Sequence, residues 1–153
     1  MQPDLVARQL LNGALKLFGE HGYEDVEPRR IAEAAGCSLD DLYARFPRKQ
    51  AFIMGLYGRI TRGLQSHAAD TPPGTVASRF QFLIRQLLVS LGPYRSLLQQ
   101  LMPAMLDPQN RLGVLGPSTD HIRADVQGLY TLLVLGADDC PAGRDQRGSD
   151  RTD

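Results

Sequence analysis

Residues 31–49, IAEAAGCSLDDLYARFPRK, decide the fold of this chain. The stretch begins with a small, alanine-rich helix face that can pack closely against a neighbouring helix. Gly36 can then adopt the left-handed backbone that ends a helix, and Ser38 can cap a second one. Two short helices joined by so tight a turn predict a helix-turn-helix.

The second helix of this motif has one buried side. Leu42 and Phe46 are four residues apart, so they lie on the same face. Other parts of the helix surface carry four further residues, namely Leu39, Asp40, Tyr43 and Ala44. A helix with such a surface is suited to the major groove of DNA.

Together with the residues before it, this motif resembles the N-terminal domain of the tetracycline-repressor-like (TetR) transcriptional regulators. The resemblance runs over residues 10–52, about the first third of the chain, and beyond it only an all-helical plan is shared. The residues that carry it, in the family's order and spacing, are Ala14, Phe18, Gly22, Tyr23, Ile31, Ala32, Ala35, Gly36, Ser38, Leu42, Tyr43, Phe46 and Lys49. It implies a protein that binds double-stranded operator DNA as a homodimer and responds to a small-molecule effector.

The composition agrees with an all-α fold. The 153 residues include 42% hydrophobic and 22% charged residues, which is ordinary for a globular protein, and Leu and Ala outnumber Val and Ile. The formal net charge is zero, so the molecule as a whole gives no electrostatic sign of a nucleic-acid partner. Any basic surface must be local.

The resemblance implies which residues contact DNA. Tyr43, Arg45 and Lys49 stand at the family's phosphate-contacting positions, and each can donate a hydrogen bond. Arg29 and Arg30 are either solvated surface or a phosphate contact; since adjacent helix residues point about 100° apart, only one can face a duplex, and we expect it to be Arg29. The complete set of expected DNA-contacting residues is Arg29, Ser38, Leu39, Asp40, Tyr43, Ala44, Arg45, Arg48 and Lys49.

Several acidic residues depart from the family pattern. Glu27, with Val26, replaces the usual threonine or serine that caps the second helix and donates to a phosphate. Asp40 and Asp41 stand where small residues are usual, and they either stabilise the positive end of the helix dipole or accept from cytosine. Across residues 1–66, nine Lys or Arg stand against eight Asp or Glu. Selective contacts must therefore outweigh bulk charge.

The periodicity of apolar residues predicts two helical domains. Helices near 4–21, 28–35 and 39–45 and a long helix near 48–67 make an N-terminal DNA-binding domain, residues 4–66. A break at 70–74 precedes a C-terminal regulatory domain, residues 75–136. Its predicted helices cover 75–91, 94–106 with an interruption at Pro103, and 118–135.

Relatives enclose an apolar ligand cavity in the C-terminal domain. The residues expected to line it here are Phe80, Phe82, Tyr94, Leu98, Met102, Met105 and Tyr130. These residues serve equally well as ordinary core. Residues 137–153 are polar and without periodicity, which predicts a disordered tail. Since the family dimerises through two further helices, the C-terminal domain looks truncated and we expect poor dimerisation.

Other classes of function find no support in the sequence. Cys37 and Cys140 are expected to be free thiols in a cytoplasmic protein, and the N-terminus does not resemble a secretory signal. The apolar stretches are too short to span a membrane. We find no histidine pair, no CxxC and no phosphate-binding glycine motif, so we expect neither an enzyme nor a cofactor or metal.

Three functions remain. The first is a DNA-binding transcriptional regulator, a repressor released by a small apolar ligand. The second is a protein that kept the fold and binds a small molecule or lipid without a role on DNA, as do the lipid-binding ubiquinone-biosynthesis proteins that resemble this family. The third is a truncated regulator that is unable to dimerise.

Overall fold

All regular structure in residues 4–140, the part of the chain that the computed structural model describes, is helical. The predicted all-α class is therefore confirmed. The helices are α1 (Leu5–His21), α2 (Pro28–Ala35), α3 (Leu39–Arg45), α4 (Gln50–Ala69), α5 (Val76–Leu91), α6 (Arg95–Leu106) and α7 (Asp120–Leu135), with short 3-10 turns η1 (Gly92–Tyr94) and η2 (Pro117–Thr119).

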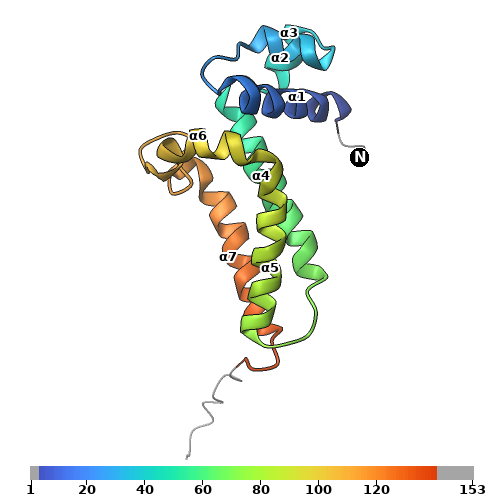
Figure 1. Ribbon diagram of the computed structural model, residues 1–153, viewed down its shortest axis with the longest axis vertical. Coiled ribbons are helices and arrows are strands. Elements are labelled where there is room, and N and C mark those ends of the chain that lie inside the picture. Colours follow the sequence, from blue (N-terminus) through green and yellow to red (C-terminus); the bar gives the residue numbers. More distant parts are fainter. Residues whose placement is uncertain (1–3, 141–153) are drawn as a thin grey trace, which may run out of the picture.

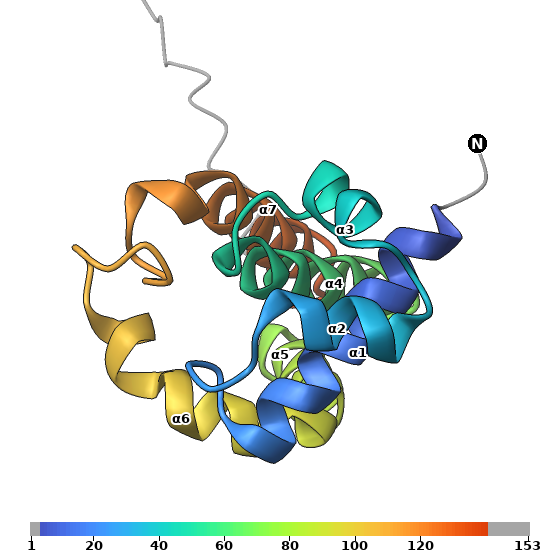
Figure 2. The same cartoon turned by 90° about the horizontal axis from the view of Figure 1, so that it is seen from above.

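The helices divide between the two ends of an elongated molecule. Helices α1, α2 and α3 pack together at one end, and α4 leads away from them (Figure 1). Helices α5 and α7 lie along the far part of α4, while α6 turns back toward α1 (Figures 1 and 2). The first three helices thus form a head that α4 connects to a small bundle.

The helix ends in the head follow the residues that predicted them. Asp4 caps α1, where its side chain accepts from the backbone N–H groups of Val6 and Ala7. Gly22 follows α1 with φ 96°, and Gly36 follows α2 in the left-handed conformation with φ 65°. These two glycines stand where a side chain would strain the backbone.

Three boundaries differ from the prediction. Helix α4 begins at Gln50 rather than near residue 48. The first backbone hydrogen bonds here, from Ala51 N–H to Arg48 O and from Phe52 N–H to Lys49 O, join residues three apart, as in a tight turn, instead of four apart, as in an α-helix. Helix α7 begins at Asp120, after η2. Pro103 does not interrupt α6, since it lies exposed near the end of that helix, where water can replace the missing bond.

The start of the predicted tail contacts the bundle. The N–H of Asp138 donates to Gly74 O at 3.0 Å, and the Asp139 carboxylate accepts from the N–H of Val76 at 2.7 Å. Residues 137–140 therefore bind to the beginning of α5. The remainder of the predicted tail, residues 141–153, lies outside the described part of the chain.

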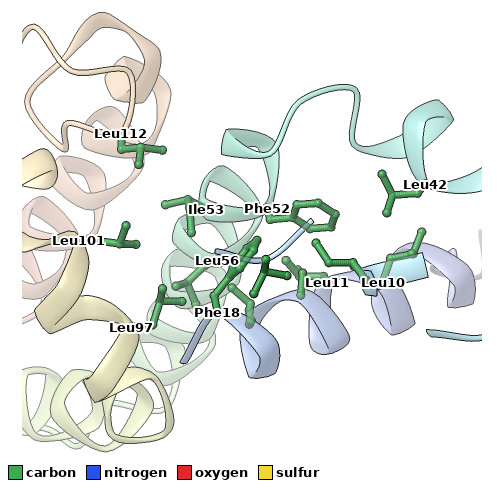
Figure 3. Close-up of a cluster of buried hydrophobic side chains, with 14 of the residues drawn as sticks. Leu10, Leu11, Phe18, Leu42, Phe52, Ile53, Leu56, Leu97, Leu101 and Leu112 are labelled. Carbon is green, nitrogen blue, oxygen red and sulfur yellow. The ribbon is translucent and has the colours of Figure 1, made fainter. Parts of the chain in front are cut away.

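One hydrophobic core joins the head to the C-terminal region. Phe18 of α1 and Phe52 and Leu56 of α4 are almost completely buried in it. Leu97 and Leu101 of α6 and Leu112 of the following loop complete the same cluster (Figure 3). The predicted domain boundary at residues 67–74 therefore separates two segments of the chain whose side chains share one core at α6.

Candidate DNA interface and junction cleft

The turn between α2 and α3 is closed by backbone hydrogen bonds. The Cys37 N–H donates to Ala32 O at 2.9 Å, and the Gly36 N–H donates to Glu33 O at 3.1 Å. This pairing satisfies carbonyls that the end of α2 would otherwise leave open. Ile31 and Leu42, one from each helix, are buried on the same side in the head core. The geometry is that of a helix-turn-helix.

Ser38 and Asp41 cap α3 together. The Ser38 hydroxyl accepts from the Asp41 N–H at 3.0 Å and donates to the Asp41 carboxylate at 2.8 Å. This hydrogen bond from Ser38 is the main reason why the pKa of Asp41 lies below its usual value. Asp41 is therefore occupied in holding the start of α3, which agrees with the first of its two expected roles, stabilisation of the positive end of the helix.

The outer surface of α3 consists of Asp40, Tyr43 and Ala44. All three side chains are exposed, Tyr43 by 49%, and Asp40 has no ion pair or hydrogen bond through its side chain within residues 4–140. Leu39, which was also expected to contact DNA, is half-buried and packs against the head core. That packing limits the part of Leu39 that can reach a base.

Arg45 is held by two carboxylates. Its Nε atom donates to Asp4 Oδ2 at 2.5 Å, and its Nη1 atom donates to Asp41 O at 3.1 Å and lies 3.4 Å from Asp41 Oδ1. The bond to Arg45 is the main cause that lowers the pKa of Asp4, and the same bond raises the pKa of Arg45. The guanidinium expected to contact a phosphate thus has acidic partners inside the protein.

Lys49 also points into the protein. Its Nζ atom donates to the backbone carbonyl of Glu24 at 3.0 Å and lies 4.9 Å from the centre of the Tyr23 ring and 5.8 Å from that of Phe18. These are cation–π distances. Burial, assisted by the charge of Glu24, raises the pKa of Tyr23 to about 12, so its ring carries a neutral hydroxyl at ordinary pH.

Two cations of the head stand open to solvent. Arg29 and Arg48 are exposed, and neither has a side-chain hydrogen bond or ion pair to another described residue. Arg30, in contrast, lies 2.9 Å from the Nε2 atom of His21. Of the four expected cationic contacts, Arg29 and Arg48 are therefore available directly, whereas Arg45 and Lys49 must exchange internal partners.

The apolar pocket expected in the C-terminal domain is not formed by its predicted residues. The rings of Phe80 and Tyr130 lie 5.8 Å apart, but both residues are exposed, as is Met102. Tyr94, Leu98 and Met105 pack instead against the junction core, and Phe82 is half-buried on α5. The space that Tyr130 helps to line between α4, α5 and α7 measures only about 20 Å³. An open apolar hollow of about 760 Å³ is also lined by α4, α5 and α7, but none of the predicted residues lines it.

A larger and more polar cleft lies at the junction of the head and α6. It has a volume of about 780 Å³ and is bounded by residues 22–25, by Lys49 and Gln50, by α6, and by residues 109–112 of the loop after α6. The Tyr57 hydroxyl donates to Leu112 O at 2.8 Å and so fastens this loop to α4. Sequence periodicity could not reveal the cleft, since its walls come from four separate segments.

Residues 4–140 contain neither a helix that could span a membrane nor a cluster of metal-ligating side chains. None of the described helices is long and apolar enough to cross a membrane. The described His, Cys, Asp and Glu side chains form no group of three or more that could hold a metal ion.

The short helices, the tight turn and the exposed side of α3 define a helix-turn-helix domain. Residues 10–54 match the family of bacterial regulatory proteins described as the tetR family. The N-terminal part of the chain therefore matches the TetR family, and the resemblance predicted from the sequence is confirmed over these residues.

Two known proteins are similar to this chain. The HTH-type transcriptional repressor KstR of Rhodococcus jostii (strain RHA1) is 28% identical over 80 residues, which are 52% of this chain and 38% of KstR. The solved structure of the fatty acid degradation regulator FadR from Bacillus halodurans is similar to this chain with a TM-score of 0.52 and 19% sequence identity. The match covers 88% of this chain and 66% of the FadR chain. This chain thus spans well under half of the curated relative, and the structural match concerns the fold.

Proposed function

We propose that this protein is a TetR-type transcriptional repressor that binds operator DNA through α3 and the turn before α4. The observation that carries the proposal is the exposed surface of α3, where Asp40, Tyr43 and Ala44 stand free of the core. Arg29 and Arg48 flank this surface in sequence with side chains available for phosphates. The 28% identity to a repressor over 80 residues of this chain gives further support.

DNA binding would require two internal exchanges. A phosphate would replace Asp4 and Asp41 as the partner of Arg45, and another would replace the Glu24 carbonyl as the partner of Lys49. Each exchange substitutes one charge-assisted contact for another, so the net gain per contact is smaller than for an unpaired cation. We therefore expect weaker nonspecific binding than the number of cations would suggest.

Regulation by an effector is the second part of the proposal. An effector that shifts α6 would reach the head directly, because Leu97 and Leu101 share a core with Phe18. The Ser96 hydroxyl also donates to Gly19 O at 3.1 Å, near the end of α1. By linkage, a ligand that favours one position of α6 changes the DNA affinity by the same free energy with which DNA changes the ligand affinity.

A fold that binds a small molecule without a role on DNA is the alternative. The internal partners of Arg45 and Lys49, together with the nearly balanced charge of the head, favour it. A gel-shift at low salt against the DNA that flanks the protein's own gene separates the two functions. The repressor is supported if the flanking DNA is retarded at protein concentrations that leave a random duplex unbound. If neither duplex is retarded, the alternative and a truncated regulator that cannot dimerise both remain, and a mass measurement in solution separates them.

A further inference from the structure

The junction cleft already holds an ammonium group, that of Lys49. This group donates to the Glu24 carbonyl at 3.0 Å and faces the Tyr23 ring at 4.9 Å. An aromatic face combined with carbonyl oxygens is the chemistry by which proteins recognise organic ammonium ions. The walls of the cleft are therefore suited to a cation, and in this structure the Lys49 ammonium occupies that position.

The charges around the cleft change when Lys49 leaves it. Two carboxylates, Glu24 and Asp25, and two cations, Lys49 and Arg111, line the cleft. Neither carboxylate forms a salt bridge with a described residue. If Lys49 turns outward to a DNA phosphate, Arg111 is the one lining cation left beside the carboxylates of Glu24 and Asp25. The Tyr23 ring face and the Glu24 carbonyl, both electronegative, then lose their cationic partner.

We propose that this cleft binds a small organic cation, a primary alkylammonium or diamine, in the place that the Lys49 ammonium vacates. The ammonium of the ligand lies on the Tyr23 face and donates to the Glu24 carbonyl, with the Glu24 and Asp25 carboxylates nearby. Its alkyl chain extends over Leu101, Ala104 and Leu112, which form the apolar part of the wall. The volume of about 780 Å³ leaves ample room for such a chain.

The site couples to DNA through Lys49, and this part of the inference rests on the proposed function. A bound organic cation excludes the Lys49 ammonium from the cleft, and a DNA phosphate attracts it outward. Both ligands therefore favour the same outward position of one side chain. Reciprocal linkage requires that the organic cation strengthen DNA binding and that DNA strengthen binding of the cation. The cation acts as a co-repressor.

The site itself is tested without DNA, with n-butylammonium chloride as the probe. Binding of the probe to the full chain is measured as an increase in the melting temperature of the protein. Sodium chloride at equal ionic strength and butan-1-ol are the two reference additives. Lys49→Ala empties the ammonium position, so we expect this variant to bind butylammonium about tenfold more tightly than the wild type. Butan-1-ol, which lacks the charge, should raise the melting temperature of neither protein.

A charge variant keeps the test decisive if Lys49→Ala folds poorly. Glu24→Gln with Asp25→Asn changes two exposed side chains and should weaken butylammonium binding to the otherwise wild-type chain about tenfold. Glu33→Gln on α2, also exposed but outside the cleft, is the matched control and should leave it unchanged. Equal melting curves for all these proteins with butylammonium and sodium chloride would overturn the site.

The coupling is tested by the DNA affinity of the wild type with and without butylammonium at constant ionic strength. We expect the affinity to rise about tenfold, a size that is usual for coupled sites, and to stay constant in Lys49→Ala. Binding of the probe without any change in DNA affinity would overturn the co-repressor role. If no DNA binds at all, the proposed repressor function fails, whereas the melting experiments still decide whether the cleft binds the cation.

Discussion

Asp4 Oδ2 accepts a hydrogen bond from Arg45 Nε at 2.5 Å, which ties the residue that caps α1 to the last residue of α3. The two residues are 41 positions apart in the sequence. Arg45 also reaches back to Asp41, so one guanidinium connects both ends of α3 with the beginning of α1. Without DNA, this arrangement orients α3 and at the same time keeps a cation from solvent.

Replacing Asp4 by Asn should strengthen DNA binding. Asn caps a helix as well as Asp does, so α1 should keep its first turn while Arg45 loses its charged partner. We expect an affinity increase of a few fold at low salt, equal on specific and random duplexes, because phosphate contacts carry no sequence information. Fluorescence anisotropy measures it.

Glu20→Gln is the control for Asp4→Asn, since it removes the same charge from an exposed position of α1 outside the Arg45 network. If both variants gain affinity equally, the gain comes from net charge. The specific competition between Asp4 and DNA would then be refuted.

The same network makes the head sensitive to acid. The pKa values of Asp4 and Asp41 in the folded protein lie below the ordinary 3.8, mainly because of the hydrogen bonds from Arg45 and Ser38 respectively. A lowered folded pKa contributes stability that is present above the unfolded pKa and is lost as the pH falls through the folded pKa. In the pH range below about 3.8 the urea midpoint of the wild type should decrease as the pH falls. The double variant Asp4→Asn with Asp41→Asn should show a less steep decrease. Parallel curves for the two proteins would contradict this origin of the acid sensitivity.

Removing the hydroxyl of Ser38 should destabilise the head. Ser38→Ala removes the cap of α3 and the hydrogen bond to the Asp41 carboxylate, for an expected cost of about 1 kcal/mol in the free energy of unfolding. Urea denaturation followed by circular dichroism measures the cost. Ser66→Ala, at an exposed position of α4 with no side-chain hydrogen bond to another described residue, should change little. Equal midpoints for the two variants would show that the cap contributes nothing.

The head could be predicted from the sequence because its signals are local. Gly36 and Ser38 fix the turn through their own backbone and hydroxyl, so the bounds of α2 and α3 follow from a few neighbouring residues. Apolar periodicity predicted a helix near residues 4–21 in the same way, and Leu10, Ala14 and Phe18 are among the buried residues of α1.

The pocket and the cation partners could not be predicted for the opposite reason. Whether Phe80 and Tyr130 enclose a cavity depends on how closely α5 and α7 approach each other, and periodicity shows only which face is apolar. Asp4, a partner of Arg45, and Glu24, the partner of Lys49, lie 41 and 25 residues away in the sequence, so the sequence identified the cations but not these internal contacts. From the sequence, Asp4 could be recognised only as a residue at the start of a predicted helix, and not as a partner of Arg45.

The exposed apolar residues at the end of α7 should govern association. Leu132 and Leu135 are 65% and 68% exposed, and Leu88 and Val89 of α5 are also exposed. Apolar surface of this kind promotes contacts between molecules. We expect the wild type to be polydisperse in sedimentation at micromolar concentration, and Leu132→Glu with Leu135→Glu to give a monomer with unchanged melting temperature.

Arg85→Glu on α5, a charge change at an already polar exposed position, is the control and should remain polydisperse. A clean, stable dimer of the wild type would contradict the expectation of poor dimerisation. A dimer that survives the two glutamates would also remove this part of α7 from the interface.

The salt dependence of DNA binding tests the repressor proposal most directly. Anisotropy is measured with the full chain on DNA flanking its own gene and on a random duplex, between about 50 and 200 mM salt, where phosphate contacts dominate the change. We expect tighter binding to the flanking DNA, and a slope of log affinity against log salt that shrinks by about 0.9 for each of Arg29→Ala and Arg48→Ala. Arg85→Ala, far from the head, should leave the slope unchanged. Absence of binding at the lowest salt, or a slope that these two head variants do not alter, would contradict the proposed interface.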